Sequence, residues 1–226
     1  MPNLTCAILV PFTGAIVTDC ERALRVLEER GYAVWRVPGF SAIDVARSQL
    51  ATDALRAGFQ ETVWIDSDVV FDPADVDRLR QSGHPIVCGV YPKKGKREIT
   101  IHVLPGAKQL LFGRVGGLVE ILYAAAGFLY VHRSAYEQIQ ARCELPVCNL
   151  HYEKPLIPFF QPLIHERDGK PWYLAEDFAF CERARRAGLA IWADTTIRLW
   201  HVGEYRYGWE DAGRDIERFA DYNFNM

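Results

Sequence analysis

The first ninety residues alternate between short apolar runs and amphipathic segments of helical period. Cys6–Val10 is a continuous apolar run, which is typical of a strand covered on both faces. The same pattern predicts strands at 32–37, 62–65 and 85–90, with helices at 18–31, 41–58 and from Asp72 onward. Repeated strand–helix–strand order requires right-handed crossovers, so this half predicts a Rossmann-like parallel sheet.

Polar and special residues mark the ends of these helices. Thr18 with Glu21, and Ser41 with Asp44, have the three-residue spacing of a capping box. Asp72-Pro73 supplies an N-cap followed by a proline in the first helical position. We therefore expect the three helices to begin at these side chains.

The pattern changes after Lys93. Residues 99–104 and 109–112 flank a Pro-Gly turn and predict a hairpin, and 118–133 is one long apolar stretch interrupted by Gly127. A helix capped by Ser134, a helix at 176–187, a strand at 189–193 and an amphipathic helix at 211–222 follow. Residues 145–173 are rich in proline and aromatic residues and show no period. We expect this half to complete the same sheet, giving one α/β domain over 1–226 with a mixed, mainly parallel sheet flanked by helices.

Composition narrows the function classes. The chain has 226 residues with 26 Lys+Arg against 29 Asp+Glu, a net charge of −3, so it carries no strong nucleic-acid-binding signal. Six cysteines without a Cys-x-x-Cys pair favour a reducing compartment, and no run reaches the ~18 apolar residues of a membrane span. A cytoplasmic protein without a transmembrane segment is expected. A zinc site is a weaker alternative, because the spacing of its candidate ligands is irregular: Cys143, Cys148, His151 and His165.

The strongest local signal follows the predicted strand at 62–65. Asp66 and Asp68 are separated by Ser67, and residues two apart on an extended chain point the same way. Ligands bind at the carboxyl ends of parallel strands, and Mg²⁺ or Mn²⁺ binds carboxylates together with phosphates. In the alternative reading, these acids only end the strand and cap the next turn.

Two further polar groups come later in the chain. Glu176 and Asp177 open a helix, where a carboxylate could deprotonate a hydroxyl or could simply complement the helix dipole. His201 follows a predicted late strand and could complete a metal shell, although a lone histidine is commonly structural.

The order of these elements resembles the GT-A glycosyltransferase superfamily. The matching elements are Asp66-Ser67-Asp68, Ala126-Gly127-Phe128, Glu176-Asp177 and His201-x-Gly203, and the segments 46–48 and 88–94 are similar to bacterial and viral members. The resemblance implies a GT-A fold with a nucleotide-sugar-binding half at 1–94 and an acceptor and catalytic half at 95–226. It also implies metal-dependent transfer of a sugar from a nucleotide-diphosphate sugar to an acceptor hydroxyl.

The resemblance also implies roles for particular residues. Asp66, Asp68 and His201 would bind Mn²⁺ or Mg²⁺, Asp177 would be the catalytic base, and Glu176 would help to bind hydroxyls. Donor-binding positions would be Pro11, Phe12, Thr13, Arg47, Asp66, Ser67, Asp68, Gly127, Phe128 and Arg206. Arg206 would neutralise the leaving group from the segment 203–209, which could instead be a surface loop. Arg47 could equally form a salt bridge on a helix face, and Lys93 and Lys94 are expected in a solvated basic turn.

Some questions stay open at this level. An inverting reaction is slightly favoured, and a retaining one remains compatible with the same motifs. A sugar-nucleotide nucleotidyltransferase would need a glycine-rich basic loop after the first strand, and residues 11–15 contain one glycine and no cation. A non-catalytic binding domain is the other alternative. The acceptor could be a glycan, a protein, a lipid or a modified nucleobase, and we expect residues 145–173 to shape its side of the site.

Overall fold

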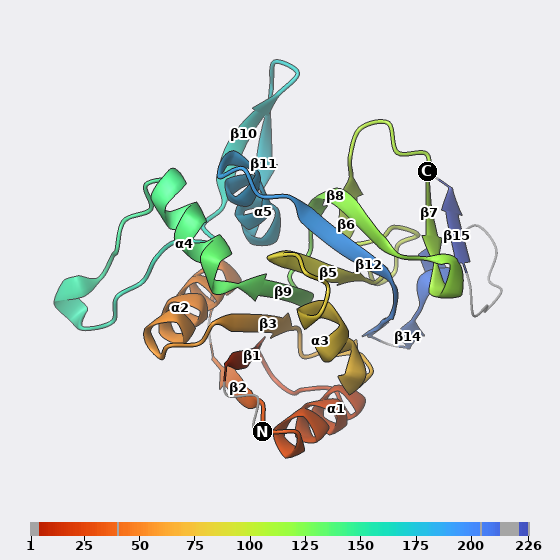
Figure 1. Ribbon diagram of the computed structural model, residues 1–226, viewed down its shortest axis with the longest axis horizontal. Coiled ribbons are helices and arrows are strands. Elements are labelled where there is room, and N and C mark those ends of the chain that lie inside the picture. The colour runs from red at the N-terminus through yellow and green to blue at the C-terminus, as the bar shows by residue number, and fades with distance from the viewer. Residues whose placement is uncertain (1–4, 40, 204, 213–221, 226) are drawn as a thin grey trace.

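The centre of the molecule is one eight-stranded sheet (Figure 1). The computed structural model describes residues 5–39, 41–203, 205–212 and 222–225. The strand order is β2-β1-β3-β9-β5-β12-β8-β6. The strands are β1 (Cys6–Phe12), β2 (Ala33–Pro38), β3 (Glu61–Ile65), β5 (Ile86–Val90), β6 (Ile101–Val103), β8 (Leu118–Ala124), β9 (Phe128–His132) and β12 (Ile191–Arg198).

Most strands of this sheet run in one direction. β1 is parallel to β2 and β3, and β12 is parallel to β5. β9 lies antiparallel between β3 and β5, so those two strands also share a direction. β8 is antiparallel to β12 and to β6. All strands except β9 and β8 therefore point the same way, which confirms the predicted mixed, mainly parallel α/β domain.

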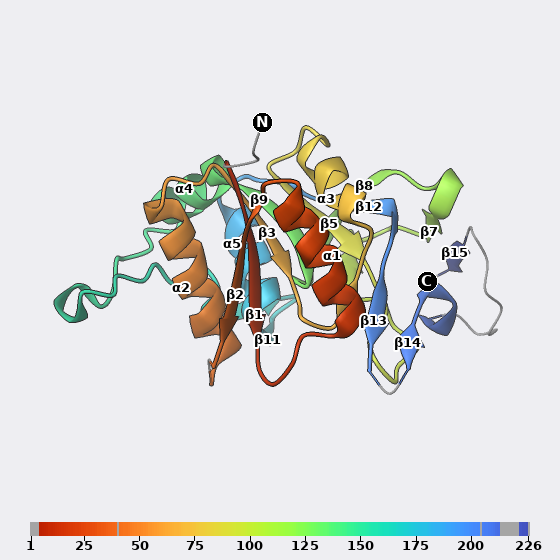
Figure 2. The ribbon, with the colours of Figure 1, turned by 90° about the horizontal axis from the view of Figure 1, so that it is seen from below.

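In the described part of the chain, five helices cover the two faces of the sheet. α2 (Ile43–Arg56), α4 (Arg133–Arg142) and α5 (Glu176–Arg186) pack on one face, and α1 (Thr18–Glu29) and α3 (Pro73–Arg80) on the other (Figures 1 and 2). The strands alternate between the two cores: Ala7 and Leu9 face α2, whereas Ile8 and Val10 face α1. Burial on both faces explains the unbroken apolar runs of the sequence.

The fold also contains smaller sheets beside the eight-stranded sheet. β4 (Val69–Val70), β13 (Trp200–Val202) and β14 (Arg206–Tyr207) form one in the order β14-β13-β4. β10 (Leu163–Arg167) pairs with β11 (Lys170–Leu174) as a hairpin that projects at the top of Figure 1. β7 (Gln109–Phe112) pairs with β15 (Tyr222–Asn225).

The predicted helix caps are only partly right. Asp72 caps α3 by accepting a hydrogen bond from the Ala74 N–H at 2.9 Å, as predicted. α1 and α2 instead begin after Val17 and Ala42, neither of which caps with its side chain. α4 is capped by His132, which accepts from the Ser134 N–H, so the predicted cap at Ser134 is wrong as well.

The hairpin predicted at 99–112 is wrong because the pairing is long-range. Residues 99–104 and 109–112 do not form a hairpin: β6 pairs with β8, and β7 pairs with β15. The apolar stretch 118–133 contains two strands, and the aperiodic segment 145–173 contains the β10–β11 hairpin. Of the predicted helix at 211–222, residues 211–212 belong to a 3₁₀ turn (Trp209–Ala212), Tyr222 begins β15, and 213–221 lie outside the described residues.

Among the described residues, no helix combines the length and apolar character that a membrane span requires.

Candidate functional site

A cleft of about 440 Å³ lies at the carboxyl ends of β1 and β3. Its walls are Pro11, Phe12, Thr13, Ser41, Ile43, Ala46, Arg47, Asp66, Ser67, Asp68 and Glu176. All of these except Ser41, Ile43 and Ala46 belong to the predicted site residues. The sheet topology brings them together because the neighbouring parallel strands β1 and β3 end at the same edge. Figure 2 shows the loop after β1 along the lower edge of the molecule, where β13 and β14 also lie.

Arg47 is the buried cation of this cleft. Its side chain is only 4 % exposed, and its Nη2 donates to Asp66 Oδ1 at 2.7 Å. Its Nε lies 3.8 Å from Glu176 Oε1. Among the described residues, none accepts a hydrogen bond from Nη1 or Nε. Buried polar groups are nearly always satisfied, so an unsatisfied guanidinium facing a cleft indicates a place for an anionic or polar ligand.

Hydrogen bonds link the backbone of Asp66 to Gly127 and, through Gly127, to Tyr91. The Asp66 N–H donates to the Gly127 carbonyl at 2.9 Å, and the Gly127 N–H donates to the buried Tyr91 hydroxyl at 3.1 Å. A Cβ at Gly127 would overlap the Tyr91 hydroxyl and lie 2.7 Å from Asp66 Oδ2. Position 127 therefore requires glycine because protein atoms pack against it.

Asp68 has different partners from Asp66. Lys94 Nζ donates to Asp68 Oδ2 at 2.5 Å, and His201 Nε2 lies 3.5 Å from Oδ1. Burial alone would raise the pKa of Asp68, but hydrogen bonds from His201 and Lys94 outweigh it and lower that pKa to about 2. Asp68 is therefore ionised throughout the physiological range.

His201 is oriented by the backbone. Its Nδ1 donates to the Pro92 carbonyl at 3.0 Å, which leaves Nε2 as the nitrogen facing Asp68. A carboxylate beside an imidazole whose other nitrogen bonds a carbonyl is a donor set that suits a divalent transition metal. Asp66 does not join this pair, because its Oδ1 is bonded to Arg47. Within the part of the chain that the structure describes, no three His, Cys, Asp or Glu side chains converge on one point, so the predicted three-residue ligand set is not assembled.

Glu176 and Asp177 open α5 beside the cleft. Glu176 lines it, and the Asp177 carboxylate accepts a hydrogen bond from the Phe178 N–H at 2.7 Å. Burial, followed by the charge of Glu176, raises the pKa of Asp177 from 3.8 to about 6. A carboxylate with this pKa can accept a proton near neutral pH and still be ionised there.

Two predicted donor-binding residues lie elsewhere. Phe128 is fully buried in the core, 5.3 Å from the Phe71 ring, so its side chain does not reach the cleft. Arg206 pairs with Val202 in the β13–β14 ladder, which places it on the face opposite His201. It donates to Asp19 and packs over the Trp200 ring at 5.5 Å. Neither side chain lines the cleft.

Lys93 and Lys94 are both partly exposed, as expected of a solvated basic turn. Lys93 bonds Glu98 at 2.7 Å, whereas Lys94 also bonds Asp68, a contact that was not expected. Lys94 follows β5 at the same sheet edge as Asp68, so the topological argument used for the acids could have identified it. Ser41, Ile43 and Ala46 carry no chemical signal; they line the cleft because α2 begins there.

The comparisons with known proteins show a similar fold, and they show no family. No protein-family model matches the sequence, and no curated protein matches it significantly. A197 from STIV has a similar solved structure, with a TM-score of 0.59 and 15% identity over 96% of this chain and 98% of that chain. This likeness shows that the two chains share a fold.

Weaker similarities include two solved structures that contain UDP-glucose or UDP. UDP-glucose pyrophosphorylase complexed with UDP-glucose has a TM-score of 0.43 and 10% identity over 87% of this chain and 93% of that chain. GalNAc-T7 with UDP, GalNAc and Mn²⁺ has a TM-score of 0.43 and 11% identity over 91% of this chain and 45% of that chain. Neither score is high enough to carry a functional argument.

Proposed function

We propose that this chain is a metal-dependent glycosyltransferase of GT-A type, which moves a sugar from a nucleotide-diphosphate sugar to an acceptor hydroxyl. The observation that carries the proposal is the cleft itself, in which Arg47, Asp66 and Asp68 lie together at the carboxyl ends of parallel strands. Residues 1–94 supply most of its walls, and residues 95–226 supply the candidate base and the histidine.

The two aspartates would have different roles, Asp68 in metal binding and Asp66 in orienting the donor. Asp68 and His201 would hold Mn²⁺ or Mg²⁺, and waters and donor phosphates would complete the shell. When bound, the metal would stabilise the charge that develops on the departing diphosphate. Asp66 is fixed by Arg47 and Gly127, so it is positioned to hydrogen-bond the ribose or sugar. The unsatisfied Nη1 of Arg47 provides a further donor to the ligand.

Asp177 is the proposed base. Its raised pKa of about 6 suits it to take the proton from the acceptor hydroxyl, and Glu176 orients ligand hydroxyls from the cleft wall. A base opposite the leaving group gives inversion, which is the outcome that we favour. Orienting the acceptor in line with the reacting carbon can contribute about 7–11 kcal/mol to the lowering of the barrier.

A nucleotidyltransferase would need to neutralise a triphosphate. Arg47, the cation among the residues that line the cleft, is already paired with Asp66, and the neighbouring Lys94 is paired with Asp68. The loop after β1 contributes Pro11, Phe12 and Thr13, none of which is charged. This charge balance favours a diphosphate donor.

The proposal is tested by the release of nucleoside diphosphate from UDP-, GDP- and dTDP-sugars, measured with and without Mn²⁺. A glycosyltransferase is expected to hydrolyse or transfer its donor only with the metal. Asp177→Asn should bind the same donor and lose turnover, because it keeps the shape of the side chain and removes the base. Saturable binding by the wild type without any turnover would contradict the enzymatic assignment.

A further inference from the structure

The ion pair between Lys94 and Asp68 is accessible to water. Lys94 Nζ donates to Asp68 Oδ2 at 2.5 Å, and the two side chains are 36% and 32% exposed. The ion pair at Asp66 differs, because its partner Arg47 is buried. Ion pairs with this much access to water contribute little to stability, so another charged group can displace one partner. Of the two cations, Lys94 is therefore the one that can exchange.

The backbone around Asp68 is fixed by neighbouring elements. The Ser67 carbonyl accepts a hydrogen bond from the Val17 N–H at 2.8 Å, beside the start of α1. The Asp68 carbonyl accepts one from the Val202 N–H of β13, also at 2.8 Å. A change of partner at the Asp68 carboxylate therefore requires movement of side chains and not of this loop.

The Lys94 side chain reaches Asp68 alongside Gly203, which follows β13. A Cβ at position 203 would lie 3.2 Å from Lys94 Cδ and 3.7 Å from its Cε. The first distance is shorter than ordinary van der Waals contact, so glycine allows the lysine stem to lie against this backbone. Two residues earlier, His201 Nε2 is 3.5 Å from the other oxygen of Asp68. The segment from His201 to Gly203 thus serves both neighbours of the carboxylate.

The charges of the cleft favour a cation at Asp68. Among the residues that line it, Asp66, Asp68 and Glu176 are acidic and Arg47 is the cation. This excess of negative charge would repel a diphosphate that arrived without a metal. Lys94 supplies one compensating charge at the carboxylate that we assign to the metal. Two cations beside one carboxylate repel each other, so Lys94 and a divalent ion compete for Asp68.

We propose that Lys94 is a counterion that exchanges partners: it neutralises Asp68 in the free protein and turns to the donor diphosphate when Asp68 holds a divalent ion. The inference rests on the proposed function. Lysine suits this exchange, because its ammonium is a compact charge with three donors on a flexible stem. Phosphate oxygens accept the same kind of charge-assisted hydrogen bond as Asp68 does. Lys94 therefore opposes binding of the metal alone and favours binding of the diphosphate to the metal-loaded protein.

The first measurement is the affinity for Mn²⁺ alone, obtained from the electron paramagnetic resonance signal of the free ion in solutions of the full chain. Lys94→Met keeps an unbranched stem beside Gly203 and removes the charge. We expect this variant to bind Mn²⁺ about tenfold more tightly than the wild type, because the competing cation is absent. Lys93→Met is the matched control, since that lysine pairs with Glu98, and it should leave the Mn²⁺ affinity unchanged.

The second measurement is the calorimetric affinity for UDP, GDP and dTDP at saturating Mn²⁺. Lys94→Met should bind the nucleotide that the wild type prefers about tenfold more weakly, the loss expected for one charge-assisted hydrogen bond. Lys94→Arg keeps the charge and should recover part of this affinity. The two effects of Lys94→Met have opposite signs, whereas general damage to the site would weaken both ligands. Unchanged circular dichroism would verify that the variants fold.

The outcomes separate this inference from the proposed function. Mn²⁺ affinity that is equal or lower in Lys94→Met, or nucleotide affinity that is undiminished in it, would overturn the exchange and leave the metal site standing. Asp68→Ala should abolish Mn²⁺ binding both alone and combined with Lys94→Met, which locates the ion. If Mn²⁺ bound equally well without Asp68, or if the wild type bound none of the three nucleotides, the proposed function would fail and this inference with it.

Discussion

Asp66 and Asp68 are two residues apart, and their surroundings separate their roles. Asp66 is held by a buried arginine and by the backbone at Gly127. Asp68 lies between Lys94 and His201. The first carboxylate is therefore rigid and already paired, whereas the second combines a low pKa with an imidazole neighbour. This difference favours Asp68 as the metal ligand and Asp66 as the group that orients the donor.

Gly127→Ala should damage the site through Asp66. The new methyl group would overlap the Tyr91 hydroxyl and lie 2.7 Å from Asp66 Oδ2, so a side chain must move. We expect a loss of about 1–3 kcal/mol in the free energy of unfolding, as for overpacked cores, together with weaker donor binding. Chemical denaturation and nucleotide titration measure the two effects.

Gly117→Ala is the matched control for this prediction, because a Cβ there meets nothing within 4 Å. Tyr91→Phe in the Gly127→Ala background should recover part of the lost stability by removing the overlapping hydroxyl. If Gly127→Ala were no more destabilising than Gly117→Ala, the packing account of Asp66 would be incorrect.

The activity should depend on pH through Asp177. A base must be deprotonated, so a pKa of about 6 predicts a rate that levels off above pH 6 and falls about tenfold for each unit below it. Glu176 contributes to the raised pKa, so Glu176→Gln should move the midpoint to lower pH. Initial rates between pH 4.5 and 8 measure both effects, and a pH-independent rate over this range would exclude Asp177 as the base.

The same pKa predicts a stability effect of defined sign. The pKa of Asp177 is raised in the folded protein, so its protonated form favours folding below about pH 4, and this contribution is lost as the pH rises through about 6. Asp177→Asn should remove this pH dependence and melt at a higher temperature than the wild type above pH 6. Melting curves of the two proteins at pH 4 and pH 7 test this difference; a gap that does not widen toward pH 7 would refute it.

At the scale of elements, local patterns predicted what local forces determine. The strands at Cys6–Phe12 and Glu61–Ile65 and the helices between them follow from apolar runs and end signals. The N-cap of α1 was misassigned because a tertiary bond decides it: the Val17 N–H donates to the Ser67 carbonyl at 2.8 Å. The pairing of β9 with β3 joins residues more than sixty positions apart, which no local period encodes.

Among the site residues, too, some positions follow from the order of residues along the chain, and others depend on long-range contacts. Asp66, Asp68 and Arg47 were predictable because their order along the chain and the strand ends bring them together. The side chains of Phe128 and Arg206 do not line the cleft, because their direction depends on strand register. The bond between Lys94 and Asp68 joins residues 26 positions apart, which are related only by the shared sheet edge.

The β7–β15 pair gives an element-scale prediction. β15 pairs with β7, and Phe224 packs against the main core. Phe224→Ala should lower the free energy of unfolding by about 1–2 kcal/mol, because the ring is only partly buried. Leu111→Ala is a control on the neighbouring strand, since that side chain is 38% exposed. Equal stability of the two variants in chemical denaturation would contradict the assigned role of β15.

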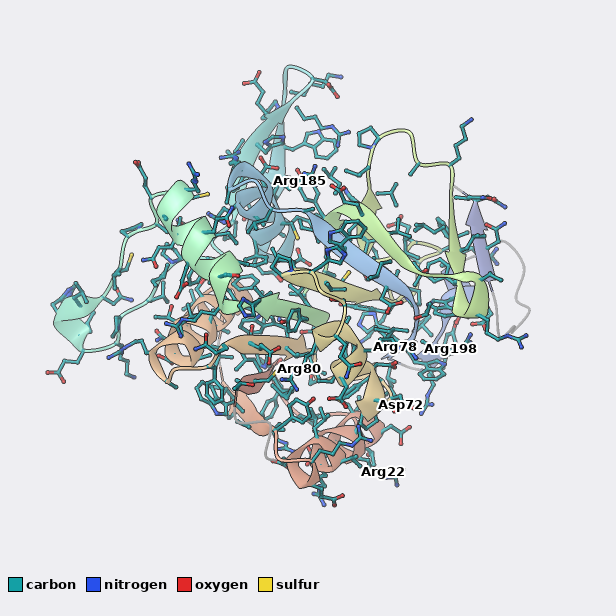
Figure 3. The ribbon with its side chains drawn as sticks, viewed as in Figure 1. Arg22, Asp72, Arg78, Arg80, Arg185 and Arg198 are labelled. Carbon is teal, nitrogen blue, oxygen red and sulfur yellow. The ribbon has the colours of Figure 1, made fainter. Side chains whose placement is uncertain are left out.

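At the scale of the whole molecule, the site joins two halves of one chain. The cleft belongs mostly to the first ninety-four residues, while Glu176, Asp177 and His201 come from the second half. Cationic side chains occur on several elements: Arg22 lies on α1, Arg80 on α3 and Arg185 on α5, apart from one another in Figure 3.

The central claim is that Asp68 and its neighbours bind a nucleotide-sugar diphosphate through a divalent metal. The most direct measurement is the thermal shift of the protein with UDP-, GDP-, CMP- and dTDP-sugars, each with and without Mn²⁺. We predict that at least one diphosphate sugar raises the melting temperature only when Mn²⁺ is present, and that Asp68→Ala abolishes this shift. No Mn²⁺-dependent shift with any nucleotide, or an undiminished shift in Asp68→Ala, would contradict the account.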